Sequence, residues 1–359
     1  MLPGGSRWRR RDQLAELSGA GGRSPEPFSM RAGIPARLLS ALAYPMRLGV
    51  DRHGENSATS GPTGTGSLAR LLDLRPTLRA ERIAVATDEA VARALAVAKV
   101  YAYASVDYPG ASQSLVFDTD GTTAVGGFVF DPGSATSPTA AFTFAGGSYQ
   151  ALTVPGSTLS VATGINMAGL IVGVYEDLAG VRRGFANNAG TFSNVDFPGA
   201  SSTQAIGVND AGQIVGDYVD AASVEHGFVS NGGTFTTIDF PGAIATVAAA
   251  INAAGDIVGQ WLDATGSHGF LLQAGVFTPI NFPLATSTTA FGINDTGEIA
   301  GFYTDAASNS HGFVYAGGAF SAVDVAGARG TQLTRIKNDG AVTGVCTDAL
   351  NEQHGLIGQ

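Results

Sequence analysis

The sequence is poor in cysteine, in charge and in long apolar runs, and each shortage excludes something. Its single cysteine, Cys346, excludes an intrachain disulfide framework. Charged residues make up only 14% of the 359 residues and hydrophobic residues 44%, a balance that argues against wholesale disorder. No apolar run reaches the ~18 residues that a membrane-spanning helix needs, so we expect no membrane span.

Basic residues are scarce beyond the first hundred positions. Residues 1–100 contain 15 Lys and Arg against 9 Asp and Glu, whereas residues 101–359 contain 5 against 21. The acidic part repels polyanions, so we expect no binding to nucleic acid. Residues 1–98 form a basic leader rich in Gly, Pro and Arg, which we expect to be largely disordered with a helix near residues 80–98. The leader resembles a signal peptide from Met30 onward, although Arg47 interrupts its apolar centre.

Local catalytic motifs are also missing. The chain contains no G-x-S-x-G, H-E-x-x-H, phosphate-binding loop, dinucleotide fingerprint or paired Cys motif. A Ser/His/Asp triad assembles in space and needs no local motif, so hydrolysis stays open. The sequence therefore assigns no catalytic residue.

Glycine is abundant, with 50 residues, and a repeat of about 43 residues runs from roughly Lys99 to the C-terminus. The Asn of an I-N-x-x-G motif recurs at Asn166, Asn209, Asn252, Asn294 and Asn338, and we align Asp118 with it in the first copy. The aromatic residue of an H-G-F motif recurs at Phe142, Phe185, Phe228, Phe270 and Phe313, with Leu356 in the last copy. An Asp closes the second strand at Asp131, Asp177, Asp220, Asp263, Asp305 and Asp348.

Each copy contains four short strand-forming segments separated by turn residues. One copy has A-I-G-V-N, then I-V-G-x-Y, H-G-F and G-x-F-x-x-x-D-F-P-G-A. Alternation predicts that Ala205, Gly207 and Asn209 share one face of the first strand, with Ile206 and Val208 on the other. Four strands in about 43 residues are typical of a propeller blade. The six copies therefore predict an all-β, six-bladed β-propeller of four-stranded blades.

The two ends of the repeat region predict how the ring closes. Residues 103–108 (YASVDY) match a fourth strand with no first three before it. The last copy stops at Gln359 without a fourth strand of its own. We therefore expect residues 99–108 to complete the last blade, which hides two sheet edges from water. The propeller then spans residues 99–359.

These motifs resemble the HAF-repeat family of bacterial extracellular repeat proteins. The signature stands here as His226-Gly227-Phe228 and as two further H-G-F copies, each downstream of an I/V-N-x-x-G. The sequence departs from the family pattern with Gly for Ala, and with Ala141 and Arg183 where His is expected. The resemblance implies an extracellular or periplasmic location and carries over no catalytic residue.

The aspartates that close the second strand precede a turn, and four of them are followed five or six residues later by His. The pairs are Asp220/His226, Asp263/His268, Asp305/His311 and Asp348/His354. A general base with its orienting acid would show this pairing. A turn whose carboxylate caps backbone N–H groups would show it too. Because catalysis rarely needs four copies, we favour the structural interpretation.

The asparagine column ends the first strand of each blade, which is the innermost strand of a propeller. One side-chain oxygen per blade, from Asp118, Asn166, Asn209, Asn252, Asn294 and Asn338, could then point toward the axis. A ring of such oxygens suits Ca²⁺, which takes six to eight oxygen ligands. An Asx turn into the following Gly explains the same residues without a metal.

Positions that break the repeat are candidates for function, because the scaffold needs only the consensus. Four of the five basic residues after position 100 lie at such positions: Arg182, Arg183, Arg335 and Lys337. We interpret Arg335 and Lys337 as replacing apolar residues of the first strand. All four are candidates for binding a carboxylate or an oxyanion.

Two functions remain open at this stage. The fold resembles six-bladed calcium-dependent lactonases of the gluconolactonase and paraoxonase type, which implies a hydrolase that opens a small lactone or ester beside an axial Ca²⁺. The alternative is a non-catalytic extracellular module that binds a glycan or a protein.

Overall fold

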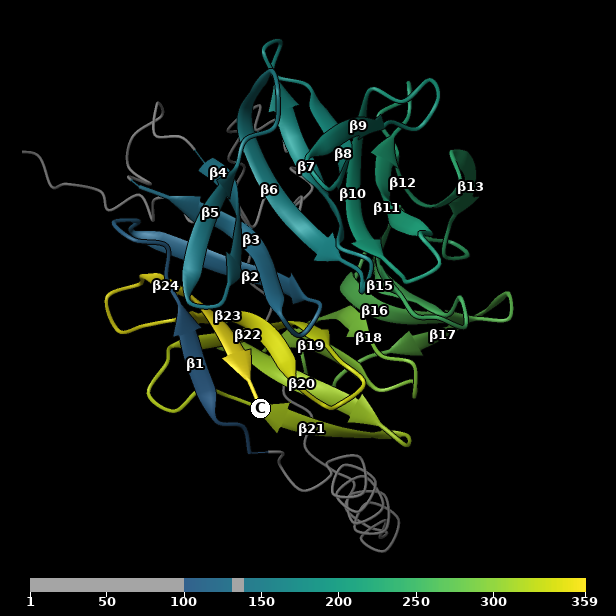
Figure 1. Ribbon diagram of the computed structural model, residues 1–359. Coiled ribbons are helices and arrows are strands. Elements are labelled where there is room, and N and C mark those ends of the chain that lie inside the picture. Colours follow the sequence, from purple (N-terminus) through teal and green to yellow (C-terminus); the bar gives the residue numbers. More distant parts are fainter. Residues whose placement is uncertain (1–99, 131–138) are drawn as a thin grey trace, which may run out of the picture. The chain divides into compact units, whose positions relative to one another are not determined.

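Six four-stranded antiparallel sheets make up the described part of the protein (Figure 1). The computed structural model describes residues 100–130 and 139–359. Every regular element in these residues is a strand. The described part of the chain has no helix long and apolar enough to cross a membrane. The prediction of a six-bladed, all-β propeller is confirmed.

In blades 1 to 5 the strands follow one another along the chain, from the axis outward. Blades 1 to 3 contain β2 (Gln113–Thr119), β3 (Thr123–Val129), β4 (Thr139–Ala145), β5 (Ser148–Leu152); β6 (Ser157–Ile165), β7 (Leu170–Asp177), β8 (Arg182–Asn188), β9 (Thr191–Val195); β10 (Ser202–Val208), β11 (Ile214–Val219), β12 (Glu225–Asn231), β13 (Thr234–Ile238). Blades 4 and 5 contain β14 (Ala245–Ile251), β15 (Ile257–Asp263), β16 (Gly266–Gln273), β17 (Val276–Ile280); β18 (Ser287–Ile293), β19 (Ile299–Thr304), β20 (Ser310–Ala316), β21 (Ala319–Val323).

Blade 6 combines the two ends of the described chain. It contains β22 (Gly330–Ile336), β23 (Val342–Thr347), β24 (Gln353–Gly358) and β1 (Tyr103–Val106). β1 pairs with β24 in a register that runs from Tyr103 opposite Gly358 to Val106 opposite Gly355. The predicted closure is therefore confirmed (Figure 1). The expected leader, residues 1–98, lies outside the described residues.

The H-G-F aromatic column forms the core between neighbouring blades. Its five phenylalanines are each at most 1% exposed and Leu356 is 2% exposed. The ring of Phe228 packs against Gly216 of β11, where a Cβ would lie 1.9 Å from the carbonyl oxygen of Gln204 and 3.0 Å from the ring. Glycine in the I-V-G motif therefore lets the innermost strand and the aromatic ring approach β11 together.

The aspartates after the second strand cap the turn that follows. The Asp220 Oδ1 accepts the N–H groups of Ala222 and Val224, both at 2.8 Å. The His226 ring lies between two carboxylates, 3.5 Å from Asp220 and 2.9 Å from Asp239. These contacts recur in other blades, which supports the structural interpretation of the Asp/His pairs.

Each innermost strand contains a β-bulge, and the bulge corrects the predicted alternation. In β10 the register shifts between Ala205 and Gly207, so Ile206 has no partner of its own in β11. Ala205 and Val208 then pack in one cluster between blades, while Ile206 packs with residues of several blades. The prediction that Ile206 and Val208 share a face is wrong because the extra residue reverses the alternation. The six bulge residues are Phe117, Thr163, Ile206, Ala249, Phe291 and Thr334.

Candidate functional site

Four asparagines of the predicted column link neighbouring blades at the end of the innermost strands. The Asn166 Oδ1 accepts the N–H groups of Ala168 at 3.1 Å and Leu170 at 3.0 Å, so it caps its own turn. Its Nδ2 donates to the carbonyl of Asn209, at 3.0 Å, in the next blade. Asn209, Asn252 and Asn294 repeat this pattern. The amide therefore serves both as a turn cap and as a connection between blades.

The hydrogen bonds of the turns assign other residues to this column in blades 1 and 6. Lys337 holds the place in blade 6, because its carbonyl accepts the Asn294 amide at 3.2 Å and its N–H donates to Ala341 at 2.8 Å. Asp120 holds it in blade 1, where its N–H donates to the carbonyl of Thr123 at 3.1 Å. Aligning Asp118 and Asn338 with the column was wrong, since the motif alone does not fix the register of the turn.

Asn338 instead lies one position beyond the column. Its Oδ1 accepts the N–H of Asp295 at 2.8 Å, and its Nδ2 donates to the Asp295 carboxylate at 2.7 Å. All five predicted asparagines nevertheless line one small pocket of about 100 Å³: Asn166, Asn209, Asn252, Asn294 and Asn338. Asp118 does not line it. Calcium binding by this ring stays a prediction, and each amide oxygen that would serve as a ligand already accepts at least one N–H.

Arg335 lies among the bulge residues and is only 5% exposed. Its two terminal nitrogens donate to five of the six bulge carbonyls at 2.8–3.4 Å: Thr163, Ile206, Ala249, Phe291 and Thr334. The sixth carbonyl, of Phe117, accepts the Thr343 hydroxyl at 3.1 Å. Burial lowers the pKa of Arg335, and Asp118 opposes that effect. A guanidinium thus provides the positive charge at the centre of the ring.

Asp118 connects this buried guanidinium to the surface. Its carboxylate lies 3.5 Å from the Arg335 Nε and 3.2 Å from the Lys337 Nζ, and it accepts the N–H of Ile165 at 3.1 Å. The Asp118 side chain is 4% exposed, whereas that of Lys337 is 28% exposed. Two cations therefore share one carboxylate, and the Lys337 amine is held in place while remaining reachable from solvent.

The other two anion-binding candidates have acidic neighbours. Arg183 occupies the His position of blade 2 and binds Asp177 at 2.8 Å and Asp196 at 3.3 Å. It thus replaces the histidine that bridges two aspartates in blade 3. Arg182 lies near Asp217, where burial raises the pKa of the carboxyl well above its usual range and the charge of Arg182 opposes that rise. Anion binding by the four basic residues stays a prediction, and of the four it is Lys337 that lines the two pockets described here.

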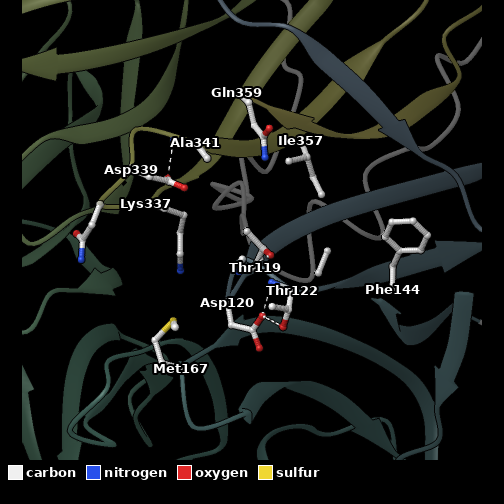
Figure 2. A pocket seen from close by; sticks show the side chains of 13 residues that line it. Thr119, Asp120, Thr122, Phe144, Met167, Lys337, Asp339, Ala341, Ile357 and Gln359 are labelled. Atoms are coloured by element: carbon white, nitrogen blue, oxygen red, sulfur yellow. Dashed lines mark hydrogen bonds between the residues drawn. The ribbon is translucent and has the colours of Figure 1, made fainter. Parts of the chain in front are cut away.

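A larger pocket of about 460 Å³ lies where blades 1 and 6 meet, on the same face as the asparagine turns (Figure 2). Blade 1 contributes the β2–β3 turn and Phe144 of β4, and blade 6 contributes the β22–β23 turn and the end of β24. Met167 from blade 2 completes the wall. The lining combines hydroxyl, amide, carboxylate and amine groups with apolar surface: Thr119, Asp120, Thr122, Lys337, Asn338, Asp339 and Gln359, with Phe144, Met167 and Ile357.

Charge in this pocket is mixed and mostly tied to backbone. Burial opposes ionisation of Asp120, but N–H groups of Thr123 and Thr122, the Thr122 hydroxyl and the Lys337 charge together hold its pKa below the usual value. The N–H of Ala253, the Asn338 amide and Lys337 lower the pKa of Asp295 at the edge of the smaller pocket. The carboxylates of Asp120 and Asp295 are therefore ionised and fixed in position at neutral pH.

Several residues of this pocket were not predicted from the sequence. Counting back three residues from the turn glycine gives Lys337 in blade 6 but Asp118 in blade 1, so the sequence carried no such signal for Asp120. Gln359 and Phe144 belong to no repeated column with a chemical signature. They reach one pocket because ring closure brings the last strand beside blade 1.

Comparison with solved structures finds similar folds at low sequence identity. AofleA from Arthrobotrys oligospora is 12% identical, with a TM-score of 0.46 over 74% of this chain and 90% of that chain. TolB from Acinetobacter baumannii is 8% identical, with a TM-score of 0.50 over 67% of this chain and 65% of that chain. The fucose-specific lectin from Aleuria aurantia is 10% identical, with a TM-score of 0.42 over 67% of this chain and 90% of that chain.

Searches with protein-family models and against curated proteins find no match. Membership of the HAF-repeat family therefore stays a prediction. The structural likeness concerns the fold, and this chain is a six-bladed β-propeller with four-stranded blades.

Proposed function

We propose that the protein is a non-catalytic binding module whose pocket between blades 1 and 6 takes a small sugar. The observation that carries the proposal is the composition of that pocket. Its volume of about 460 Å³ falls within the ~300–1,000 Å³ range of small-molecule sites. A sugar offers hydroxyl groups that both donate and accept, together with one apolar face of C–H groups.

The lining residues match that chemistry group by group. Asp120 and Asp339 accept hydrogen bonds, Lys337 donates, and Asn338 and Gln359 offer amide groups. Phe144 provides an aromatic surface against which a sugar ring can pack. Figure 2 shows the labelled polar side chains and Phe144 around one hollow.

The polar groups are also held in position before a ligand arrives. Lys337 is held by the buried Asp118, at 3.2 Å. The Asp120 carboxylate accepts the N–H groups of Thr122 and Thr123, both at 2.7 Å. A site that is already ordered loses less conformational entropy on binding. A sugar ligand suits the extracellular or periplasmic location expected from the family resemblance, and the location belongs to the same proposal.

A calcium-dependent hydrolase for a small lactone or ester is the second candidate. The convergence of five asparagines on the smaller pocket favours it. The reaction would need their oxygens to exchange N–H partners for a metal, and Arg335 already supplies a buried cation at the axis. Sugar binding requires no such rearrangement.

One set of measurements separates the two candidates. The full-length protein is titrated by calorimetry against neutral and acidic mono- and disaccharides, and assayed with a lactone panel with and without chelator. We expect a sugar to bind, Ala341→Phe to abolish binding by filling the pocket, and Lys337→Met to weaken it about tenfold through loss of a charged donor. Arg329→Met serves as the matched control, because Arg329 contacts Asn351 in the β23–β24 turn, on the opposite face.

Melting temperatures of the variants check that each is folded. Gln359→Ala is a second pocket variant, and the Gln359 side chain makes no hydrogen bond within the part of the chain that the structure describes. Binding that survives both Ala341→Phe and Gln359→Ala would place the sugar elsewhere and refute the site. Lactone turnover that requires Ca²⁺ would contradict the non-catalytic binding module and support the hydrolase.

A further inference from the structure

A buried acidic pair in blade 3 breaks the repeat. Asp217 of β11 is 1% exposed. Its register partners are Gln204 of β10 and Gly227 of β12. The equivalent positions in the other blades hold no charge: Gly127, Val174, Gln260, Phe302 and Val345. Val174 and Val345 belong to the apolar cluster that gathers side chains from all around the axis. A carboxyl group here is therefore a departure that the fold does not require.

The second carboxyl belongs to Glu225 on β12. Since Asp217 lies opposite Gly227 and Val219 lies opposite Glu225, the two acids are diagonal neighbours on one face of the sheet. Each carboxyl group is near enough to affect the pKa of the other. Two buried carboxyl groups this near to each other are stabilised by a shared proton or by a cation.

Oxygen atoms without partners accompany the pair. Gln204, 4% exposed, donates from Nε2 to the Asp217 Oδ2 at 3.1 Å. Within residues 100–130 and 139–359, neither the Gln204 Oε1 nor the Asp217 Oδ1 has a hydrogen-bond partner. Buried polar atoms without partners cost free energy, and their occurrence side by side calls for an explanation.

Among the residues that the structure describes, the charges around the pair are unbalanced. Arg182 from blade 2 acts on both carboxyl groups, and Glu176 lies directly opposite Arg182 in the β7–β8 register. When ionised, these three carboxylates and one guanidinium carry a net charge of −2. A divalent cation neutralises that charge.

We propose that Gln204, Asp217 and Glu225 form a binding site for a hard divalent cation of the Ca²⁺ or Mn²⁺ class. The three side chains come from three adjacent strands of one blade and offer only oxygen ligands, the set that such ions prefer. The site is separate from the asparagine ring and from the sugar pocket, so it does not depend on the proposed function.

Protons and the cation compete for the same oxygens. Burial, with a contribution from Glu225, raises the pKa of Asp217 well above its usual range, and burial raises the pKa of Glu225 to about 7. Cation binding must displace the shared proton, so it strengthens as pH rises. Arg182 repels the cation, and its removal should strengthen binding.

The test uses the full-length protein after treatment with a chelator. Ca²⁺ and Mn²⁺ are titrated separately by calorimetry and by thermal unfolding at about pH 8 and about pH 5.5. We expect one ion per chain, a rise in melting temperature of about 5 °C at ~100 times the dissociation constant, and at least tenfold weaker binding at the lower pH. Asp217→Asn and Glu225→Gln should each abolish the effect, and Arg182→Gln should strengthen binding.

The matched control is Asp348→Asn. Asp348, Glu352 and His354 place ligand atoms within 4.8 Å of one another at the β23–β24 turn and could hold a metal themselves. The proposal requires the Asp348→Asn protein to bind the ion as the wild type does. It is overturned if about 10 mM of either ion leaves the melting curve unmoved at pH 8, or if binding survives Asp217→Asn and is lost in Asp348→Asn.

Discussion

Replacing Arg335 by Met tests whether a guanidinium holds the centre of the ring. Methionine fills a similar volume but cannot donate to the bulge carbonyls. Three of the five bonds that it removes are 2.8 Å long, and the other two are 3.2 and 3.4 Å. Asp118 keeps Lys337 as its remaining cation.

The expected cost follows from the three short bonds and the lost ion pair. A buried acceptor left without a partner costs about 1–3 kcal/mol, and breaking a buried ion pair costs about 3–5 kcal/mol, terms that overlap here. We expect a loss of about 3–5 kcal/mol in the free energy of unfolding. For a domain of this size the melting temperature should fall by about 6–10 °C. Arg335→Lys should lose less, because an ammonium can still donate to as many as three carbonyls.

Urea unfolding followed by circular dichroism measures the difference, with Arg329→Met as the control for loss of an exposed arginine. The reasoning is refuted if Arg335→Met unfolds at the same urea concentration as the wild type. Asp118→Asn should cost less than Arg335→Met, because the guanidinium keeps all five carbonyl bonds. An equal cost would mean that the ion pair, rather than the carbonyl ring, holds Arg335.

Three further predictions concern strain, pH and closure. Leu284 adopts φ of 65° in a turn where other blades have glycine, and its side chain is 87% exposed. Leu284→Gly should therefore raise the free energy of unfolding by about 0.5–1 kcal/mol, measured in urea. A lower free energy of unfolding would show that the leucine side chain makes stabilising contacts. Glu225 has a folded-state pKa of about 7 against an ordinary 4.5, so the folded state binds its proton more tightly and loses stability as pH rises between these values. With chelator present, Glu225→Gln should therefore gain stability over the wild type above pH 7 and not below pH 4.5; parallel pH profiles would contradict the shift. Deleting residues 1–107 removes β1 and exposes the edge of β24, whereas deleting 1–99 leaves every described strand, so only the longer deletion should lower the melting temperature and solubility.

The repeat predicted the architecture because its signals are local. Strand-forming runs, glycine turns and the unmatched YASVDY segment were enough to give six blades and their closure. The buried phenylalanine column was visible for the same reason, since every copy after the first places Phe228 or its equivalent 15 or 16 residues after the turn glycine.

The candidate site was less predictable because it depends on register. The bulge recurs at the same place in every innermost strand, so equivalent positions have to be counted from it. Counted in this way, Arg335 takes the place of Gly207, and Lys337 takes the place of Asn209, rather than replacing apolar residues. No local pattern reveals that Arg335 would meet carbonyls from four other blades. The pairing of Asp217 with Glu225 likewise depends on a diagonal across two strands.

The connections between blades differ in kind around the ring. From blade 2 to blade 6, the neutral side-chain amides of four asparagines each donate to a backbone carbonyl of the next blade. From blade 6 through blade 1 to blade 2 the side chains at the same end of the strands form an ionic connection instead, from Lys337 to Asp118 and on to the Ile165 N–H. Salt weakens charged contacts near solvent and leaves neutral amide bonds nearly unchanged. Rising ionic strength should therefore loosen the ring at this one seam, and amide hydrogen exchange in β2 and β22 should respond before exchange in β10 or β14.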